Sequence, residues 1–93
     1  MTKKNNIKEI LKLAYNNLKE QNYTEAQKYF EKAQDLDPKS WIIQNNLGII
    51  YKKLGQYQNA IDIFQKIINN NPNIPEPHNN LANIFKEIGL IKQ

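Results

Sequence analysis

The hydrophobic residues of this chain recur every three or four positions, the spacing that places them on one face of an α-helix. The pattern occurs in five stretches, which we predict to be five helices separated by polar turns. The apolar face of the first stretch consists of Ile7, Ile10, Leu11, Ala14 and Leu18. The faces of the next three consist of Ala26, Phe30 and Ala33, then Leu47, Ile50, Tyr51 and Leu54, then Ala60, Ile61, Phe64, Ile67 and Ile68.

Polar and helix-breaking residues predict where the first helices begin and end. A turn at 21–23 ends the first helix. Thr24 then starts the second, with Gln27 three residues on as the other half of a capping box. The second helix stops before Pro38, because proline does not continue a helix easily. Ser40 is the predicted cap of the third helix.

The later boundaries are predicted in the same way. Gly55 and Gly89 stand where a left-handed residue is wanted, so we expect them to end the third and fifth helices. The fourth helix is expected from about 58 to 70. The asparagines at 69–71 are interpreted as a turn between repeats and not as a low-complexity segment. The fifth helix begins near Pro75, since proline is tolerated in a first helical turn.

The whole pattern repeats with a period of 34 residues. Leu13-Ala14, Tyr23, Ala26, Phe30 and Pro38 return as Leu47-Gly48, Tyr57, Ala60, Phe64 and Pro72, and the pattern starts again at Leu81-Ala82. A fixed period of this size indicates stacked supersecondary units, none of which buries its apolar face alone.

This spacing resembles the tetratricopeptide repeat, a helix–turn–helix unit, over roughly residues 7–93. The resemblance implies an all-α fold: a right-handed α-solenoid of antiparallel helix hairpins, with two full repeats plus the first helix of a third. We place the full repeats at 7–40 and 41–74, and a partial repeat or capping helix at 75–93. Together they are predicted to form a single domain, residues 1–93.

Small residues predict where the two helices of each hairpin cross closely. They are Ala14, Gly48 and Ala82 on the first helices and Ala26 and Ala60 on the partner helices. We expect Phe30 and Phe64 to fill the space that these small residues leave. Gln44 and His78 depart from the family pattern, because their position is commonly large and apolar.

The composition disfavours catalysis. The chain has no cysteine and a single histidine, so it has no thiolate chemistry and no disulfide framework. No second metal ligand lies near His78 in the pattern, and there is no glycine-rich phosphate loop. We therefore expect no catalytic residue, no cofactor and no metal site, and we interpret the protein as a non-enzyme.

Nucleic acids and membranes are also disfavoured as partners. The net charge of +4 permits weak phosphate contacts. However, every cation is Lys, without the arginines that read guanine, and the aromatic residues fall on packing positions. No apolar run approaches the ~18 residues that a membrane-spanning helix needs. We expect a soluble, cytoplasmic protein.

The resemblance implies a concave groove lined by the first helix of each repeat. The predicted groove residues are Lys12, Tyr15 and Lys19, then Asn45, Asn46, Ile49, Lys52 and Lys53, then Asn79, Asn80, Asn83 and Lys86. Asn46 and its equivalent Asn80 could hold the backbone of an extended peptide, because a carboxamide both donates and accepts. The lysines favour an acidic segment or a C-terminal carboxylate. The alternative for each of these residues is an ordinary solvated face.

Some members of the family hold a chaperone's C-terminal carboxylates with a two-carboxylate clamp built from Lys, Asn and Arg. The corresponding residues here are Leu11, Tyr15, Asn46, Glu76 and Asn80. Only Asn46 matches, so this chain is not expected to form such a clamp.

The predicted function is a non-catalytic protein–protein interaction module that binds an extended or acidic peptide segment. The alternative is a self-associating scaffold, or a fragment of a longer repeat array, with no dedicated peptide ligand. The residues predicted to self-associate, as a homodimer through the fifth helix, are Leu81, Phe85, Ile88, Leu90 and Ile91. If Leu90 and Ile91 instead fold back over the apolar strip, no such contact is expected.

Overall fold

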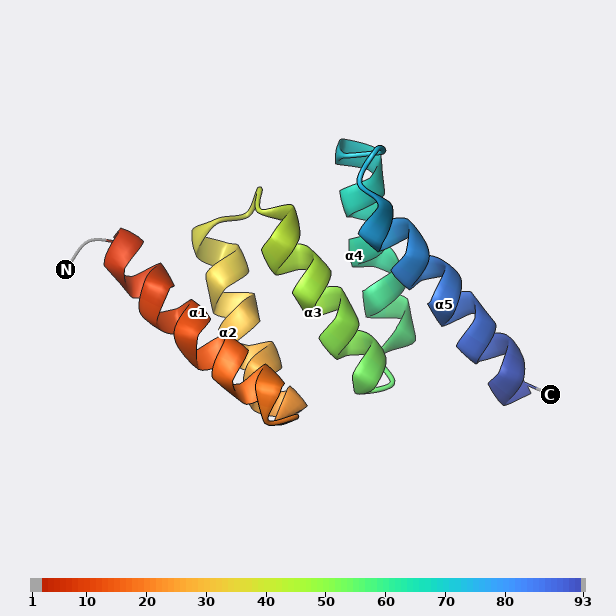
Figure 1. The fold of residues 1–93 in the computed structure, drawn as a ribbon, viewed down its shortest axis with the longest axis horizontal. Helices are drawn as coiled ribbons and strands as arrows, with labels where there is room; N and C mark the ends of the chain where they lie inside the picture. Colours follow the sequence, from red (N-terminus) through yellow and green to blue (C-terminus); the bar gives the residue numbers. More distant parts are fainter. Residues whose placement is uncertain (1–2, 93) are drawn as a thin grey trace.

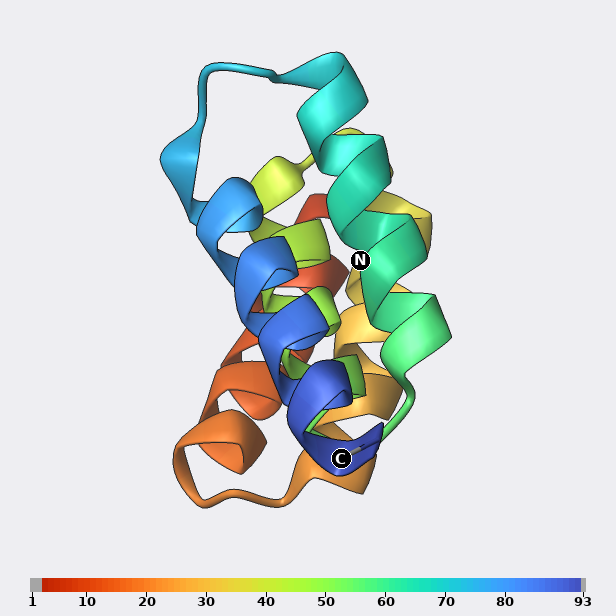
Figure 2. The same cartoon turned by 90° about the vertical axis from the view of Figure 1, so that its right-hand side faces the viewer.

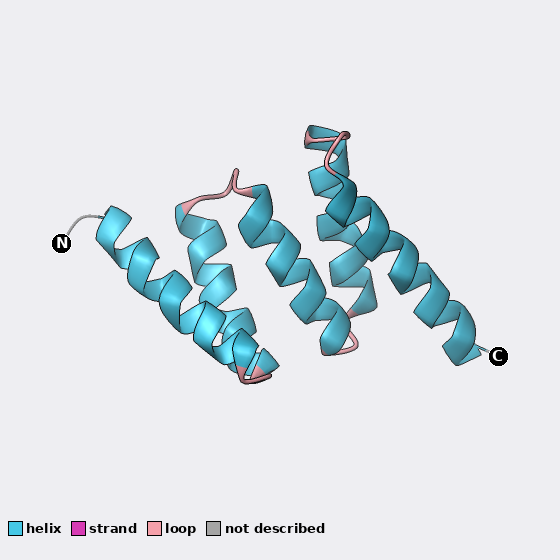
Figure 3. Ribbon diagram, viewed as in Figure 1, coloured by secondary structure: helices cyan, strands magenta, loops and turns pink. Residues whose placement is uncertain are grey.

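The computed structural model describes residues 3–92, and these residues form five helices and no strand (Figures 1 and 3). The helices are α1 (Lys3–Lys19), α2 (Tyr23–Leu36), α3 (Trp41–Lys53), α4 (Tyr57–Asn70) and α5 (Pro75–Lys92). The predicted all-α fold is therefore confirmed.

The helices form two layers. In Figure 2, α1, α3 and α5 lie in one layer, and α2 and α4 lie in the other. Each helix of the second layer packs against the first-layer helices before and after it in the chain. The molecule measures 51 × 29 × 17 Å, and Figure 1 shows its termini at opposite ends of the longest dimension. The shape is that of a short stack of hairpins.

Of the five small residues predicted at the helix crossings, four are buried there, whereas Ala82 on α5 is exposed. Ala14, Ala26 and Ala60 are fully buried, together with Phe30 and Phe64. A Cβ atom added to Gly48 would lie 2.6 Å from Cζ of Phe64 and 3.0 Å from Cγ2 of Ile63. The ring of Phe64 thus occupies the space that a side chain at Gly48 would need.

Both turns inside the hairpins are built from the same hydrogen bonds. Gln21 N–H donates to Leu18 O (3.0 Å) and Asn22 N–H to Asn17 O (2.8 Å). The same two bonds recur one repeat later. Gly55 N–H donates to Lys52 O at 3.0 Å, and Gln56 N–H donates to Tyr51 O at 2.8 Å. This is the Schellman motif, which requires a left-handed residue.

That left-handed residue is glycine in only one of the two turns. Gly55 has φ 77°, as predicted, and Gln21 has φ 63°. A left-handed conformation costs a non-glycine residue about 1–2 kcal/mol. The packing of the first hairpin therefore holds Gln21 in a conformation that its own backbone disfavours.

The predicted start of the second helix is wrong. The second helix begins at Tyr23, so Thr24 lies inside its first turn, and the predicted capping box does not form there. Gln27 donates instead to Glu31 (3.2 Å). The fourth helix, Tyr57–Asn70, agrees with the prediction of about 58 to 70. The predicted cap of the third helix is confirmed, because Ser40 Oγ accepts from Ile43 N–H at 3.3 Å.

The prediction that Gly89 ends the fifth helix is wrong. The helix α5 continues through Gly89 to Lys92. After the left-handed residues of the first two repeats come Asn-Tyr and Gln-Tyr, which start the next helix, whereas Gly89 is followed by Leu90-Ile91. Leucine is a strong helix former, so the sequence favours further helical turns at this point.

The departures at Gln44 and His78 are explained by hydrogen bonds to the turns between the hairpins. Gln44 Nε2 donates to Pro38 O, and His78 Nε2 donates to Pro72 O, both at 2.8 Å. Each turn is thereby fastened to the helix that follows it. Gln44 is buried among its neighbours, whereas His78 is exposed.

Replacing Gly48 with alanine tests the close approach of α3 and α4. We expect Gly48→Ala to lower the free energy of unfolding by about 1–3 kcal/mol, because the Phe64 ring must move. The matched control is Gly89→Ala, since a Cβ there meets nothing within 4 Å. In a helix interior this change should stabilise the protein by about 0.5–1 kcal/mol. Urea unfolding measures both, and equal effects of the two variants would contradict the packing described.

Candidate functional site

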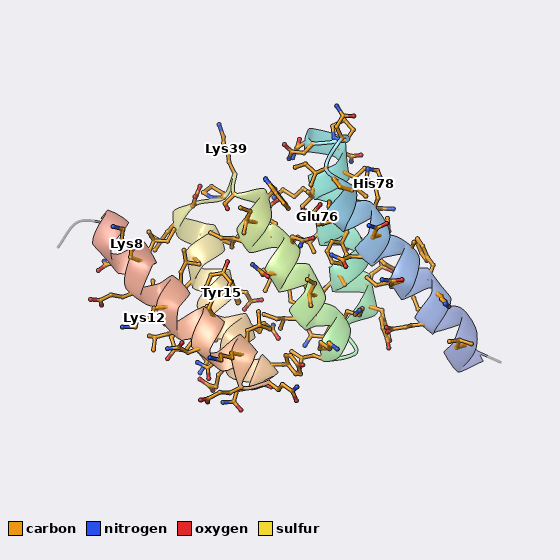
Figure 4. The ribbon with its side chains drawn as sticks, in the orientation of Figure 1. Lys8, Lys12, Tyr15, Lys39, Glu76 and His78 are labelled. Atoms are coloured by element: carbon orange, nitrogen blue, oxygen red, sulfur yellow. The ribbon has the colours of Figure 1, made fainter. Side chains whose placement is uncertain are left out.

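Most of the predicted groove residues lie on the α1–α3–α5 face, the outer side of the first helix layer. Figure 4 shows Tyr15 on α1 pointing toward α3, and Glu76 near the start of α5. Side chains on this face are mostly exposed, and Asn45, Asn46 and Asn80 are half-buried between helices.

Three pairs of side chains join neighbouring helices across this face. Asn46 Nδ2 donates to the hydroxyl of Tyr15 at 3.0 Å, linking α3 to α1. Asn80 Nδ2 donates to Asn45 Oδ1, also at 3.0 Å, linking α5 to α3. The structure thus brings together predicted residues that are 31 and 35 positions apart in the chain.

The third pair is ionic. Lys52 Nζ lies 3.6 Å from Glu87 Oε1, and the Lys52 side chain is only 17% exposed. Lys52 is therefore paired with a carboxylate of α5, whereas the neighbouring Lys53 is exposed. Sequence reasoning treated the two lysines as equivalent, and only the packing of α3 against α5 separates them.

The paired amides keep part of their hydrogen-bonding capacity. Asn46 uses an N–H toward Tyr15, so its carbonyl oxygen is available, and the Tyr15 hydroxyl is available as a donor. In the second pair, the amide N–H groups of Asn45 and the carbonyl oxygen of Asn80 are available. The face therefore offers both donors and acceptors in the middle of the helix layer.

Two predicted groove residues have other neighbours. Lys12 lies on the outer side of α1, away from α3 (Figure 4), where it lines a small hollow with Glu9, Leu13 and Asn16. Ile49 packs against the second part of the core. The ring of Tyr15 also has a packing role, since it meets Phe30 edge-on with centroids 5.1 Å apart.

Charge is unevenly distributed over the face. The α1 residues Lys8 and Lys19 are exposed, as is Lys53 on α3. On α5, Asn79, Asn83 and Lys86 are exposed, while Glu76 and Glu87 bring negative charge. The basic half of the face is therefore the half formed by α1 and α3.

Sequence reasoning missed a polar chain between the two layers. The Tyr51 hydroxyl donates to Glu31 Oε2 at 2.9 Å, and the same oxygen accepts from Gln27. Gln56 Nε2 in turn donates to Gln27 Oε1 at 3.4 Å, reaching the next hairpin. Burial raises the pKa of Tyr51 to about 12, and the hydrogen bond to Glu31 and its charge add to the effect.

The predicted self-association residues divide into two groups. Leu81 and Ile88 pack against the core. Phe85 is 53% exposed and Leu90 64% exposed, so Leu90 does not fold back over the helix. The side chain of Ile91 lies outside the part of the structure that is described. Ile84, which is fully buried, was missed although its equivalent Ile50 was assigned to an apolar face.

A second apolar surface, which the sequence analysis did not identify, lies at the other end of the molecule. A hollow of about 490 Å³ opens between α1 and α2. Its lining residues are Asn6, Glu9, Ile10, Leu13, Lys32, Asp35 and Leu36. The 34-residue period held a signal for it, since Leu47 is buried against the first hairpin while its equivalent Leu13 is 44% exposed.

Within residues 3–92, no three His, Cys, Asp or Glu side chains gather as metal ligands would. In the same part of the chain, no helix combines the length and the apolar character needed to cross a membrane.

Known proteins share this repeat architecture. The TPR repeat-containing protein YvcD of Bacillus subtilis (strain 168) is 34% identical over 76 residues, which cover 81% of this chain and 16% of YvcD. The solved structure of MamA from AMB-1 superimposes with a TM-score of 0.80 at 24% identity, over 89% of this chain and 45% of MamA. A tetratricopeptide repeat protein from Parabacteroides merdae ATCC 43184 gives 0.81 at 18% identity, over 92% of this chain and 35% of that protein.

The chain is therefore a tetratricopeptide repeat protein. A family model described as RMD1-3, Regulator of microtubule dynamics protein 1-3, matches residues 4–88, and the chain belongs to that family. It spans about one sixth of the length of the curated relative and less than half of each solved structure.

Ionisation of Tyr51 should weaken the protein at high pH. Its pKa is 10.0 unperturbed and about 12 when folded, so its stabilising contribution is complete below pH 10 and is lost between pH 10 and 12. We expect the difference in free energy of unfolding between wild type and Tyr51→Phe to be constant below pH 9 and to shrink above pH 10. Urea titrations at pH 8 to 11.5 measure it, and parallel curves for the two proteins would contradict the pKa shift.

Proposed function

We propose that the α1–α3–α5 face binds an extended, acidic peptide segment of a protein partner. The observation that carries this proposal is the row of joined side chains, Tyr15–Asn46 and Asn45–Asn80, which crosses all three helices. A module for protein interaction is the general role of this repeat class, and the peptide is the finer step proposed here.

The amides support an extended backbone as the ligand. A peptide strand presents N–H and C=O groups in alternation along its length. The available groups on the face also alternate in kind, as the Tyr15 hydroxyl, the Asn46 carbonyl, the Asn45 amide N–H and the Asn80 carbonyl. The backbone of a strand lying across the three helices would find both donors and acceptors on this face. Such binding would not require a particular side-chain sequence in the peptide.

The lysines support acidic side chains on that peptide. Lys19 and Lys53 are equivalent residues of the first two repeats, and both are exposed. Lys52 contributes less free charge, because Glu87 lies beside it. Acidic residues of the ligand are therefore placed over α1 and α3, and its less charged part over α5.

Reversing two lysines tests the electrostatic part of the site. We expect Lys19→Glu with Lys53→Glu to weaken binding of a fluorescent ten-residue Glu/Gly peptide about tenfold at low salt, a loss of about 1.4 kcal/mol. The loss should fade above ~0.3 M salt, because exposed charges are screened. Fluorescence anisotropy measures both.

The matched control is Lys39→Glu with Lys66→Glu. This variant changes the net charge by the same amount as the test variant. Its substitutions lie away from the proposed site, because Lys39 is in the turn before α3 and Lys66 is on α4, in the second layer. A loss of affinity as large as that of the test variant would assign the binding to net charge alone. Equal affinity of all three proteins at low salt would remove the proposed site.

A second candidate role is self-association through α5. The exposed Phe85 and Leu90 favour it, since large apolar side chains left uncovered on a small protein are candidates for a contact site. Ala82, which is the equivalent of the covered Gly48, is also exposed. In this role the chain acts as a scaffold that joins copies or continues a longer array.

Sedimentation tests this role. The weight-average mass of the wild type should rise with concentration from ~10 to ~500 μM, and that of Phe85→Gln should stay at the monomer value, because the variant lacks the apolar contact. Ile88 is left unchanged, since it packs against the core and its loss would disturb the fold. A wild type that is monomeric throughout would end this candidate.

A further inference from the structure

The two exposed apolar surfaces lie at opposite ends of the molecule. One is the hollow between α1 and α2, which we call the leading hollow, with Ile10, Leu13 and Leu36 as its apolar lining. The other is on α5. Figure 1 places α1 and α5 at the two ends of the longest dimension of the molecule, which measures 51 Å.

The surface on α5 is a ridge with one bulky side chain. His78, Ala82, Phe85 and Gly89 follow one another at helical spacing and are all exposed, and we call them the α5 stripe. A Cβ at Gly89 would meet nothing within 4 Å. The ring of Phe85 therefore projects between two small residues, as a knob that a hollow can receive.

The chain itself shows that both surfaces accept apolar side chains from a neighbouring helix. Leu47, the equivalent of Leu13, is fully buried against the preceding hairpin. Gly48, the equivalent of Ala82, is covered by the ring of Phe64. Where a neighbour is present, each of these positions is closed, so a second copy has surfaces of the right kind to close both.

The charges around the two surfaces are complementary. Two carboxylates, Glu9 and Asp35, line the leading hollow. The third charged lining residue, Lys32, has its ammonium 5.9 Å from the centroid of the Tyr29 ring. Among side chains described in the structure, neither carboxylate is within 4 Å of a cation. On α5, the exposed Lys86 adjoins Phe85, so a positive charge accompanies the knob.

The geometry points to head-to-tail association of this chain with itself, in which the α5 stripe of one copy enters the leading hollow of the next. This inference rests on the proposed self-association. It differs in that α5 contacts the leading hollow of the next copy and not the α5 of a second copy. Because the two surfaces differ and lie at opposite ends, the contact is heterologous and leaves one free surface of each kind after every addition. Copies therefore form an open row and not a closed dimer.

The size of the contact sets its strength. An end of the molecule measures about 29 × 17 Å, so end-to-end docking buries roughly 500 Å² per copy. The total of roughly 1,000 Å² is at the lower limit of specific interfaces. Row formation should accordingly be weak and reversible, with dissociation constants in the micromolar range or above.

A mixing experiment separates this arrangement from a symmetric dimer through α5. Leu13→Gln blocks the hollow, and Phe85→Gln blocks the stripe. Each change is at an exposed position, so the fold should tolerate it. Each variant alone should be monomeric or nearly so by sedimentation velocity. An equimolar mixture should form a one-to-one heterodimer, because it contains one intact hollow and one intact stripe that can meet.

Ile42→Gln is the control, since Ile42 is 50% exposed but belongs to neither surface. This variant should associate like wild type.

Other outcomes overturn the inference in distinguishable ways. If Leu13→Gln alone still dimerises and only Phe85→Gln prevents it, self-association through α5 stands and the head-to-tail contact is wrong. If the wild type stays monomeric up to 1 mM, both are wrong. Should Leu13→Gln melt below the wild type, Leu36→Gln blocks the same hollow from α2 and must give the same complementation with Phe85→Gln.

Discussion

The contact between the Phe64 ring and the backbone of Gly48 sets how closely α3 and α4 approach, and the rest of the arrangement depends on that distance. With a Cβ at Gly48 the ring would be 2.6 Å away, so the observed spacing requires glycine. In the first hairpin, Ala14, Ala26 and Phe30 are buried in the same manner. Because each hairpin has a fixed thickness, successive first-layer helices are spaced closely enough for their side chains to bond across the gap.

Polar contacts between repeats occur on both sides of this apolar core. On the outer face, Asn46 bonds to α1 and Asn80 bonds to α3, in each case the preceding helix of the same layer. Between the layers, Tyr51, Glu31 and Gln27 connect α2 to α3. Apolar packing tolerates small sliding motions, whereas hydrogen bonds have narrow geometry. The core therefore supplies most of the stability, and these bonds fix the alignment of one hairpin on the next.

The sequence predicted most of the fold, because burial and helix crossing follow from spacing within a single chain. It predicted the small residues at the crossings, the cap at Ser40 and the left-handed Gly55. It failed at Gly89, since a helix end depends on the residues that follow it. It could not predict which polar side chains would meet: the partners of Asn46 and Lys52 depend on how α3 aligns with its neighbours. The proposed groove residues were recognised by their frame positions, whereas the leading hollow exists only because a position buried in one repeat is exposed in another.

The bonds from Gln44 to Pro38 O and from His78 to Pro72 O have a mechanical consequence. Each fastens a connecting turn to the helix that follows it, so it sets the inclination of one hairpin on the next. A stack of repeats has no contacts that span its whole length, so these local fastenings act in series. Each fastening would therefore carry the whole of a force along the long axis, and the extension would be divided among them as a small rotation at every joint before any hairpin opens.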